Sequence, residues 1–179
     1  MAETRLNPGL IQVYTGDGKG KTTCALGLAL RAVGQGFKVY MVQFMKGRDT
    51  GEARVAADRL APDMTLRHFG RPGLVNLRAP DEEDLALIRE AWDLARQVIV
   101  AGEHDLVILD EINLALSFNL LPPQEVFQVL RNRPPWVEVV LTGRQAPPEL
   151  VELANLVTEM RPVKHYYETG VQARRGIEW

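Results

Sequence analysis

The chain contains one cysteine, no long apolar run and no excess of basic residues. A single cysteine, Cys24, cannot form an internal disulfide and supplies no cluster of thiolates, which excludes a disulfide scaffold and a zinc ribbon. No segment approaches the ~20 apolar residues of a membrane-spanning helix. The polar first nine residues also lack the apolar core of a signal peptide. We therefore expect a cytoplasmic protein with no membrane partner.

The charge balance is nearly neutral. The 179 residues include 21 Lys and Arg and 23 Asp and Glu, giving a formal net charge of -2. Proteins that bind along a nucleic-acid backbone need a basic excess to neutralise its phosphates, so we expect no nucleic-acid partner. At ~100–200 residues per domain, the length predicts a single domain over residues 1–179.

Six short apolar or β-branched runs with turn residues nearby predict β-strands. The run from Leu106 to Leu109 is apolar on both faces, which predicts a central strand, whereas residues 64–67 alternate and suit a sheet edge or a half-covered position. The six runs are residues 10–14, 38–44, 64–69, 106–110, 137–142 and 156–160.

Helical spacing fills the stretches between these runs and is clearest over residues 81–101. Apolar residues recur there every three or four positions, and Pro80 followed by an acidic run marks the helix start. Strands that alternate with helices predict right-handed crossovers and a largely parallel sheet covered on both faces. The sequence therefore predicts an α/β fold, with glycine-, proline- and charge-rich flexible segments over residues 46–51, 70–79 and 164–179.

The first predicted strand runs into a glycine-rich segment, residues 15–23, followed directly by a helical pattern. This order is typical of a phosphate-binding loop, in which backbone N–H groups and the helix N-terminus face a polyphosphate. Lys21 would supply a positive charge, and Thr22 would offer a hydroxyl to Mg²⁺. Thr15 stands where the common motif has glycine, and Lys21 stands where a dinucleotide-binding motif would need one. The alternative is a glycine-rich turn that only caps the helix.

The buried run 106–109 leads directly into Asp110 and Glu111. Carboxylates at the carboxyl end of such a strand face the phosphate-binding loop and can hold Mg²⁺ directly or through water. Adjacent residues point in different directions, so one is expected to face the metal and the other to brace the loop, without the sequence deciding which. The alternative is that the pair caps a helix from Ile112.

Several other residues have ordinary interpretations. Cys24 is expected to be a small buried residue, and the histidines to have surface or capping roles. Lys19 would contact phosphate or point to solvent. Arg31, ten residues after Lys21, would usually be solvated.

Five motifs in order resemble the ATP:corrinoid adenosyltransferases of the cobalamin pathway, over nearly the whole chain. In that family the phosphate-binding loop is similarly offset, as Thr15 requires. The motifs are residues 13–23 (VYTGDGKGKTT), 42–47 (VQFMKG), 109–111 (LDE), 141–144 (LTGR) and 159–165 (EMRPVKH).

The resemblance implies a RecA-like P-loop fold, a three-layer sandwich with a largely parallel six-stranded sheet, usually as a homodimer. It implies transfer of the 5′-deoxyadenosyl group of ATP to Co(I) of a reduced corrinoid, with release of inorganic triphosphate and Mg²⁺ as the metal. The triphosphate would lie reversed relative to hydrolytic P-loop enzymes. A flavoprotein is a candidate electron donor, and the C-terminal residues 166–179 would help to cover the site.

The resemblance also assigns site residues. Lys21, Thr22 and Glu111 would be catalytic, and Thr22, Glu111 and Asp110 would lie at the metal. Phe69 would contact the corrinoid, although it could equally be a core residue that ends its strand, and no tryptophan follows it as in relatives. The residues expected to bind the substrates are Gly16, Asp17, Gly18, Lys19, Gly20, Lys21, Thr22, Thr23, Arg31 and Phe69.

Two other functions are compatible with the same loop. A phosphotransferase or NTPase would cut the β–γ bond of ATP and release ADP or phosphate. A nucleotide-dependent carrier would bind ATP and corrinoid with little turnover.

Overall fold

The sheet has six parallel strands in the order β3-β2-β4-β5-β1-β6, in a computed structural model that describes residues 5–47, 50–73 and 75–178. Each predicted strand is confirmed to within one residue at either end. All residues of β4 are buried between β2 and β5, and β3 lies at an edge, as their sequence patterns predicted. The strands are β1 (Ile11–Thr15), β2 (Val39–Phe44), β3 (Met64–Phe69), β4 (Leu106–Asp110), β5 (Glu138–Thr142) and β6 (Leu156–Glu159).

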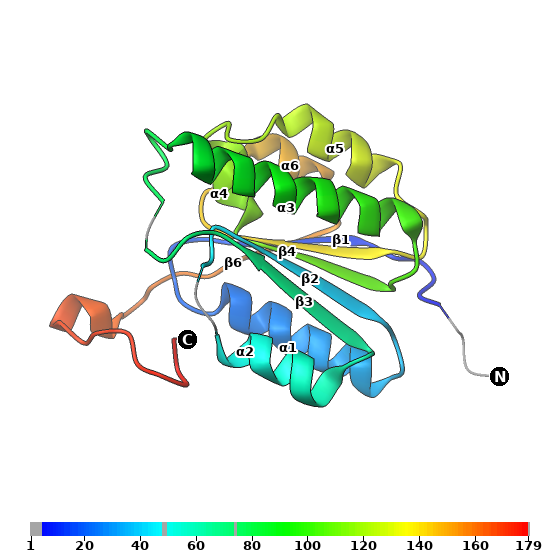
Figure 1. Cartoon of the computed structure of the whole chain (residues 1–179), viewed down its shortest axis with the longest axis horizontal. Helices are drawn as coiled ribbons and strands as arrows, with labels where there is room; N and C mark the ends of the chain where they lie inside the picture. Colours follow the sequence, from blue (N-terminus) through cyan, green and yellow to red (C-terminus); the bar gives the residue numbers. More distant parts are fainter. Residues whose placement is uncertain (1–4, 48–49, 74, 179) are drawn as a thin grey trace.

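Helices cover both faces of the sheet and give the predicted three-layer α/β arrangement (Figure 1). On one face lie α1 (Lys21–Gly34) and α2 (Gly51–Val55), which continues into a π-helical turn, Ala56–Leu60. On the other lie α3 (Glu82–Ala101), α4 (Ile112–Ser117), α5 (Pro123–Arg131) and α6 (Pro148–Leu153). No helix within the described ranges is long and apolar enough to cross a membrane.

The predicted helix over residues 81–101 is α3, and Asp81 is its N-cap. The Asp81 side chain accepts a hydrogen bond of 2.9 Å from the backbone N–H of Asp84, and Gly102 ends the helix at a φ of 62°. Ile88, Trp92 and Ile99 are at most 2% exposed against the sheet. Burying each side chain of this size contributes about 1.5–3 kcal/mol, so packing rather than intrinsic propensity fixes α3 in place.

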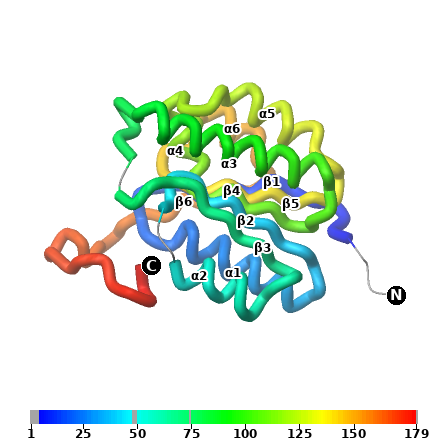
Figure 2. The backbone as a smooth tube through the Cα atoms, viewed as in Figure 1, coloured from blue at the N-terminus to red at the C-terminus, as the bar shows by residue number. Residues whose placement is uncertain are grey.

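Alternating residues of the strands build a separate core on each face of the sheet. Leu109 packs with Trp92 under α3, whereas Ile108 packs with Ala25 and Ala29 under α1. These two cores bring the start of α1 to the carboxyl edge of the sheet, beside the end of β4. The segment after β6, which includes the short 3₁₀-helix Tyr166–Thr169, runs to the same edge (Figure 2).

Candidate functional site

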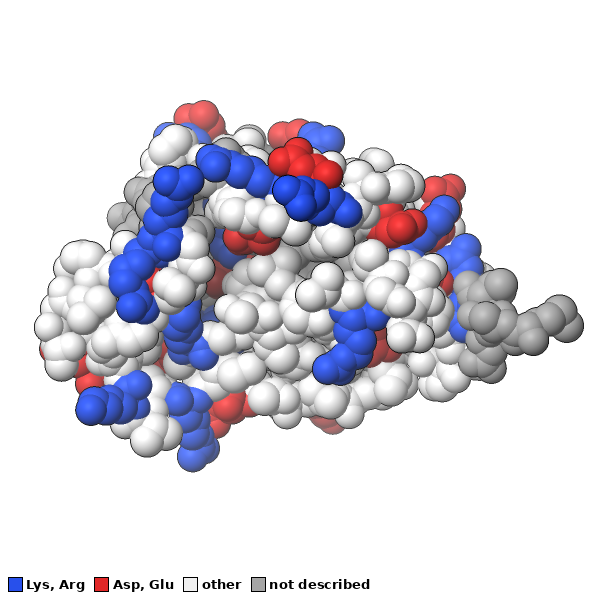
Figure 3. Space-filling view, turned by 90° about the horizontal axis from the view of Figure 1, so that it is seen from below, with Lys and Arg blue, Asp and Glu red and all other residues white. Residues whose placement is uncertain are grey.

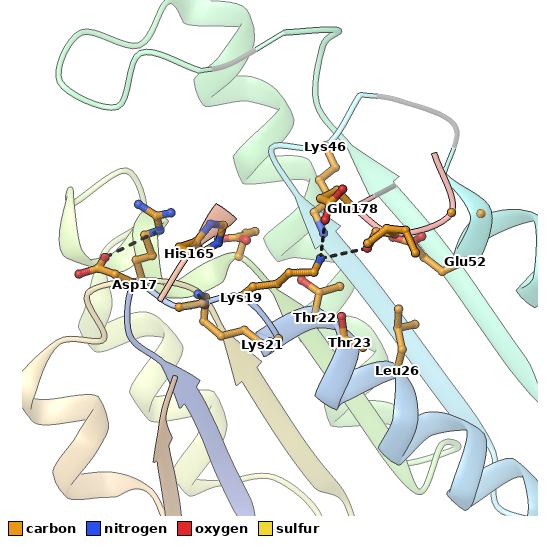
Figure 4. Close-up of a pocket in the computed structure, with 17 residues that line it drawn as sticks. Asp17, Lys19, Lys21, Thr22, Thr23, Leu26, Lys46, Glu52, His165 and Glu178 are labelled. Carbon is orange, nitrogen blue, oxygen red and sulfur yellow. Dashed lines mark hydrogen bonds and ion pairs between the residues drawn. The ribbon is translucent and has the colours of Figure 1, made fainter. Parts of the chain in front are cut away.

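A pocket of about 490 Å³ opens at the carboxyl edge of the sheet. Ligands of parallel α/β proteins bind at this edge because the strand-to-helix loops meet there. Figure 4 shows Asp17 and His165 on one side of the pocket and Glu52 on the other, with Thr22, Thr23 and Leu26 along α1. The lining residues are Asp17 to Thr23, Leu26, Lys46, Gly51, Glu52, Glu111, Arg144, His165 and Gly176 to Glu178.

The glycines of the loop are required by close contact with the segment that follows β6. A Cβ atom on Gly16 or Gly18 would lie 2.5 or 2.7 Å from the carbonyl oxygen of Met160, and Gly16 has a φ of 92°. The N–H of Gly18 donates to the same oxygen at 2.7 Å. Thr15 still belongs to β1, where no glycine is needed, and its hydroxyl accepts a 3.2 Å hydrogen bond from the N–H of Ala146.

Lys21 points into the loop. Its side chain donates from Nζ to the carbonyl oxygens of Gly16 and Gly18 at 2.7 and 2.8 Å, and the residue is 8% exposed. Burial lowers the pKa of Lys21, and the negative charge of Glu111 opposes that shift. The first turn of α1 contains no acidic residue, so its N-terminus adds unopposed positive potential. This arrangement suits a bound polyphosphate.

Asp110 is fully buried and binds four donors. One carboxylate oxygen accepts from the hydroxyls of Thr22 at 2.9 Å and Thr142 at 2.6 Å. The other accepts from Nε2 of Gln43 at 3.1 Å and contacts the ammonium of Lys46. Asp110 therefore braces the loop through the Thr22 hydroxyl, a role expected from the sequence for one member of the pair.

Glu111 is the member of the pair that lines the pocket. Its backbone has a φ of 67°, and its N–H donates to the Thr142 hydroxyl at 3.1 Å. Within the described part of the chain, its carboxylate accepts no hydrogen bond. Burial raises the pKa of Glu111, and the negative charge of Asp110 raises it further.

These oxygen groups are suited to Mg²⁺. The Thr22 hydroxyl, the Asp110 carboxylate and the Glu111 carboxylate are hard ligands, and a bound cation would offset the unfavourable effect of burial and of Asp110 on an ionised Glu111. In the described ranges no group of three His, Cys, Asp or Glu could hold a metal alone. That sparse protein ligand set fits Mg²⁺, which usually keeps several waters and binds substrate phosphates.

Sequence reasoning assigned no role to several lining residues. Arg144 follows β5 in one of the five motifs, and its guanidinium lies 3.8 Å from the carboxylate of Asp17, in an exposed pair that contributes little to stability. Positive side chains concentrate toward the end of the α1 face where the C-terminal segment lies (Figure 3). Glu52 of α2 carried no sequence signal, because only the fold brings it to the pocket.

The C-terminal segment forms one wall of the pocket. Lys19 donates from Nζ to the carbonyl oxygen of Ile177 at 2.9 Å and lies 3.6 Å from the Glu178 carboxylate. Hydrogen bonds from Arg174 and Tyr166 lower the pKa of Glu178 to about 2. His165 has the predicted capping role, since its Nδ1 accepts from the N–H of Tyr167 at 3.1 Å.

Three residues discussed from the sequence lie outside this pocket's lining. Arg31 is exposed in the last turn of α1. Phe69 is 7% exposed within the core at the end of β3. The expectation of a buried Cys24 is wrong: the thiol is exposed, because Ala25 and Ala29 form the buried stripe of α1 and Cys24 lies beside that stripe.

Comparisons with known proteins agree with this geometry. Residues 7–179 match the family model described as ATP:corrinoid adenosyltransferase BtuR/CobO/CobP. Corrinoid adenosyltransferases of Escherichia coli (strain K12) and Pseudomonas aeruginosa are 39% and 38% identical to this chain, covering all of it and 90% and 88% of the relatives. The corrinoid adenosyltransferase CobA of Salmonella typhimurium is 36% identical over the whole chain and 90% of its own length. The chain therefore belongs to the ATP:corrinoid adenosyltransferase family.

Proposed function

We propose that this enzyme binds ATP in the P-loop pocket, transfers its 5′-deoxyadenosyl group to Co(I) of a reduced corrinoid and releases inorganic triphosphate. The observation that carries the proposal is the position of Lys21, buried within the loop at the N-terminus of α1. This place suits the triphosphate, and the reaction leaves its negative charge there.

The reaction needs little proton transfer from the protein. The lone pair of Co(I) forms the cobalt–carbon bond at C5′ while the C5′–oxygen bond breaks. The electron pair of the broken C5′–oxygen bond leaves with the triphosphate. No general base is required. The chain must align the two reactants and stabilise the charge that grows on the leaving group.

Lys21, Arg144 and the loop N–H groups are the donors placed to do this. Lys19 would join them once its contact with Ile177 and Glu178 opens. Thr22 and Glu111 would hold Mg²⁺, with Asp110 fixing the Thr22 hydroxyl from behind. When bound, Mg²⁺ neutralises phosphate charge and supports departure of the triphosphate.

Other parts of the proposal rest on the family alone. These are the homodimer, the electron-donor flavoprotein, the place in cobalamin biosynthesis or salvage and the cytoplasmic location. Arg31 and Phe69 remain predicted substrate contacts; as they stand, one is exposed on α1 and the other is a core residue.

The test combines purified protein, Mg²⁺, ATP and chemically reduced cobalamin without oxygen. We expect a light-sensitive alkylcobalamin and inorganic triphosphate in equal amounts. Orthophosphate without alkylcobalamin would instead identify a phosphotransferase or NTPase. Binding of both substrates with negligible turnover would identify a carrier.

A further inference from the structure

Lys46, at the end of β2, is the only positively charged group bound to the buried carboxylate of Asp110 in the described part of the chain. The Asp110 side chain is 0% exposed and that of Lys46 is 25% exposed, so the contact is largely removed from water. The other three donors to Asp110 are neutral hydroxyl or amide groups. Without Lys46, no cation among the described residues would be in direct contact with Asp110.

The backbone holds Lys46 in place through close contacts with the end of β3. Met45 has a φ of 55°, a conformation that is strained for a residue with a side chain. The Lys46 N–H donates to the Phe69 carbonyl at 3.0 Å. A Cβ atom on Gly47 or Gly70 would meet neighbouring backbone at 2.2 or 2.5 Å. These backbone contacts fix the turn that places the Lys46 ammonium against the Asp110 carboxylate.

Asp110 contacts that ammonium, and Glu111 and Glu52 are close enough to interact with its charge. Nε2 of Gln43 donates to Asp110 and also to Oε1 of Glu52, at 3.1 and 3.3 Å, which links the two acids. Glu111 is the next residue after Asp110 and lines the same pocket as Lys46 and Glu52. Burial alone would lower the pKa of Lys46, but Asp110, Glu111 and Glu52 together raise it.

We propose that Lys46 is a positioning residue that offsets part of the negative charge of these carboxylates in the nucleotide-free enzyme and competes with a divalent cation for them. The cation then binds well only together with the nucleotide phosphates. These phosphates supply oxygen ligands and negative charge in place of the carboxylates that Lys46 occupies. The inference rests on the proposed function, because it concerns the same Mg²⁺ site. Lys46 acts here through Asp110 and Glu111, so its role differs from that of Lys21.

The test measures binding of Mn²⁺ alone to nucleotide-free protein by calorimetry. Lys46→Met is expected to bind Mn²⁺ at least tenfold more tightly than the unmodified enzyme, because a competing positive charge has gone. Lys46→Arg keeps the charge and should stay within about twofold of the unmodified enzyme. Lys38→Met removes an exposed lysine outside the pocket and is the matched control.

A second measurement keeps the test decisive if Lys46→Met folds poorly. Mn²⁺ should raise the melting temperature of Lys46→Met and Lys46→Gln, or restore their folded circular-dichroism spectrum, because the cation replaces the missing ammonium. A purely structural lysine would give no such rescue. Unchanged or weaker Mn²⁺ binding, or no rescue in either variant, would overturn the inference.

Adenosyl transfer by the unmodified enzyme is measured separately, which distinguishes the two failures. An active enzyme with no gain of Mn²⁺ binding in Lys46→Met refutes only the role of Lys46. An inactive enzyme whose Lys46→Met variant gains Mn²⁺ binding supports the role of Lys46 and refutes the proposed reaction.

Discussion

Replacing Asp110 by alanine tests whether its carboxylate organises the site. The substitution removes the acceptor for two hydroxyls and one amide, and it leaves the Lys46 ammonium without its principal counter-ion in a mostly buried position. Breaking a buried ion pair in this way costs about 3–5 kcal/mol of unfolding free energy. For a chain of this length each kcal/mol lowers the melting temperature by about 2–4 °C, so we expect a fall of about 6–20 °C.

Urea unfolding followed by circular dichroism gives the free energy directly. Asp58→Ala, which removes an exposed carboxylate next to α2, is the control and should change stability by less than about 0.5 kcal/mol. A loss below about 1 kcal/mol for Asp110→Ala would refute the reasoning. It would mean that water or a moved side chain satisfies the four donors.

Four other changes test separate parts of the site. Lys21→Ala should lower the turnover number for adenosyl transfer by roughly 100- to 1000-fold, since it removes a charged donor to the leaving group, and an unchanged rate would reject that role. Glu178→Gln removes the negative charge that pairs with Lys19 and Arg174, so the backbone amides of residues 174–178 should exchange hydrogen faster, and equal exchange would contradict a fixed C-terminal wall. Truncation at residue 164 removes this wall, and full activity afterwards would show that the wall is dispensable. Glu111→Gln should raise the free energy of unfolding at neutral pH without metal. Burial raises the pKa of Glu111 in the folded state above 4.5, so ionisation of this acid destabilises the fold as the pH rises from 4.5 through the folded-state pKa. The gain should vanish below pH 4.5, and a pH-independent difference in urea unfolding would contradict this explanation.

The strands and the P-loop could be predicted because their signals are local. A strand such as β4 is a short run of apolar residues, and the loop is a contiguous motif between a strand and a helix. The helix α3 was predicted together with its start, since Pro80, the acidic run and the residues of its buried face lie in one segment. For α4, the sequence indicated only a start at Ile112, as part of the alternative role of Asp110 and Glu111, because a helix of six residues shows little periodicity.

The bracing role of Asp110 could not be assigned from sequence. It depends on Gln43, Lys46 and Thr142, which reach Asp110 from two neighbouring strands. For the same reason, local sequence patterns could not predict that Glu52 and the C-terminal wall line the pocket, since their contacts join residues far apart along the chain. The exposure of Cys24 was mispredicted because a single small thiol side chain next to a loop does not indicate whether it lies on the buried or the exposed face of its helix.

The most direct test of the central claim is a crystal structure of the enzyme with Mg²⁺ and ATP. We expect the triphosphate to lie within the loop, with phosphate oxygens in hydrogen-bond distance of Lys21 and of backbone N–H groups at the start of α1, and with C5′ facing the open side of the pocket. A nucleotide bound elsewhere, with the loop still closed on Lys21, would contradict the account.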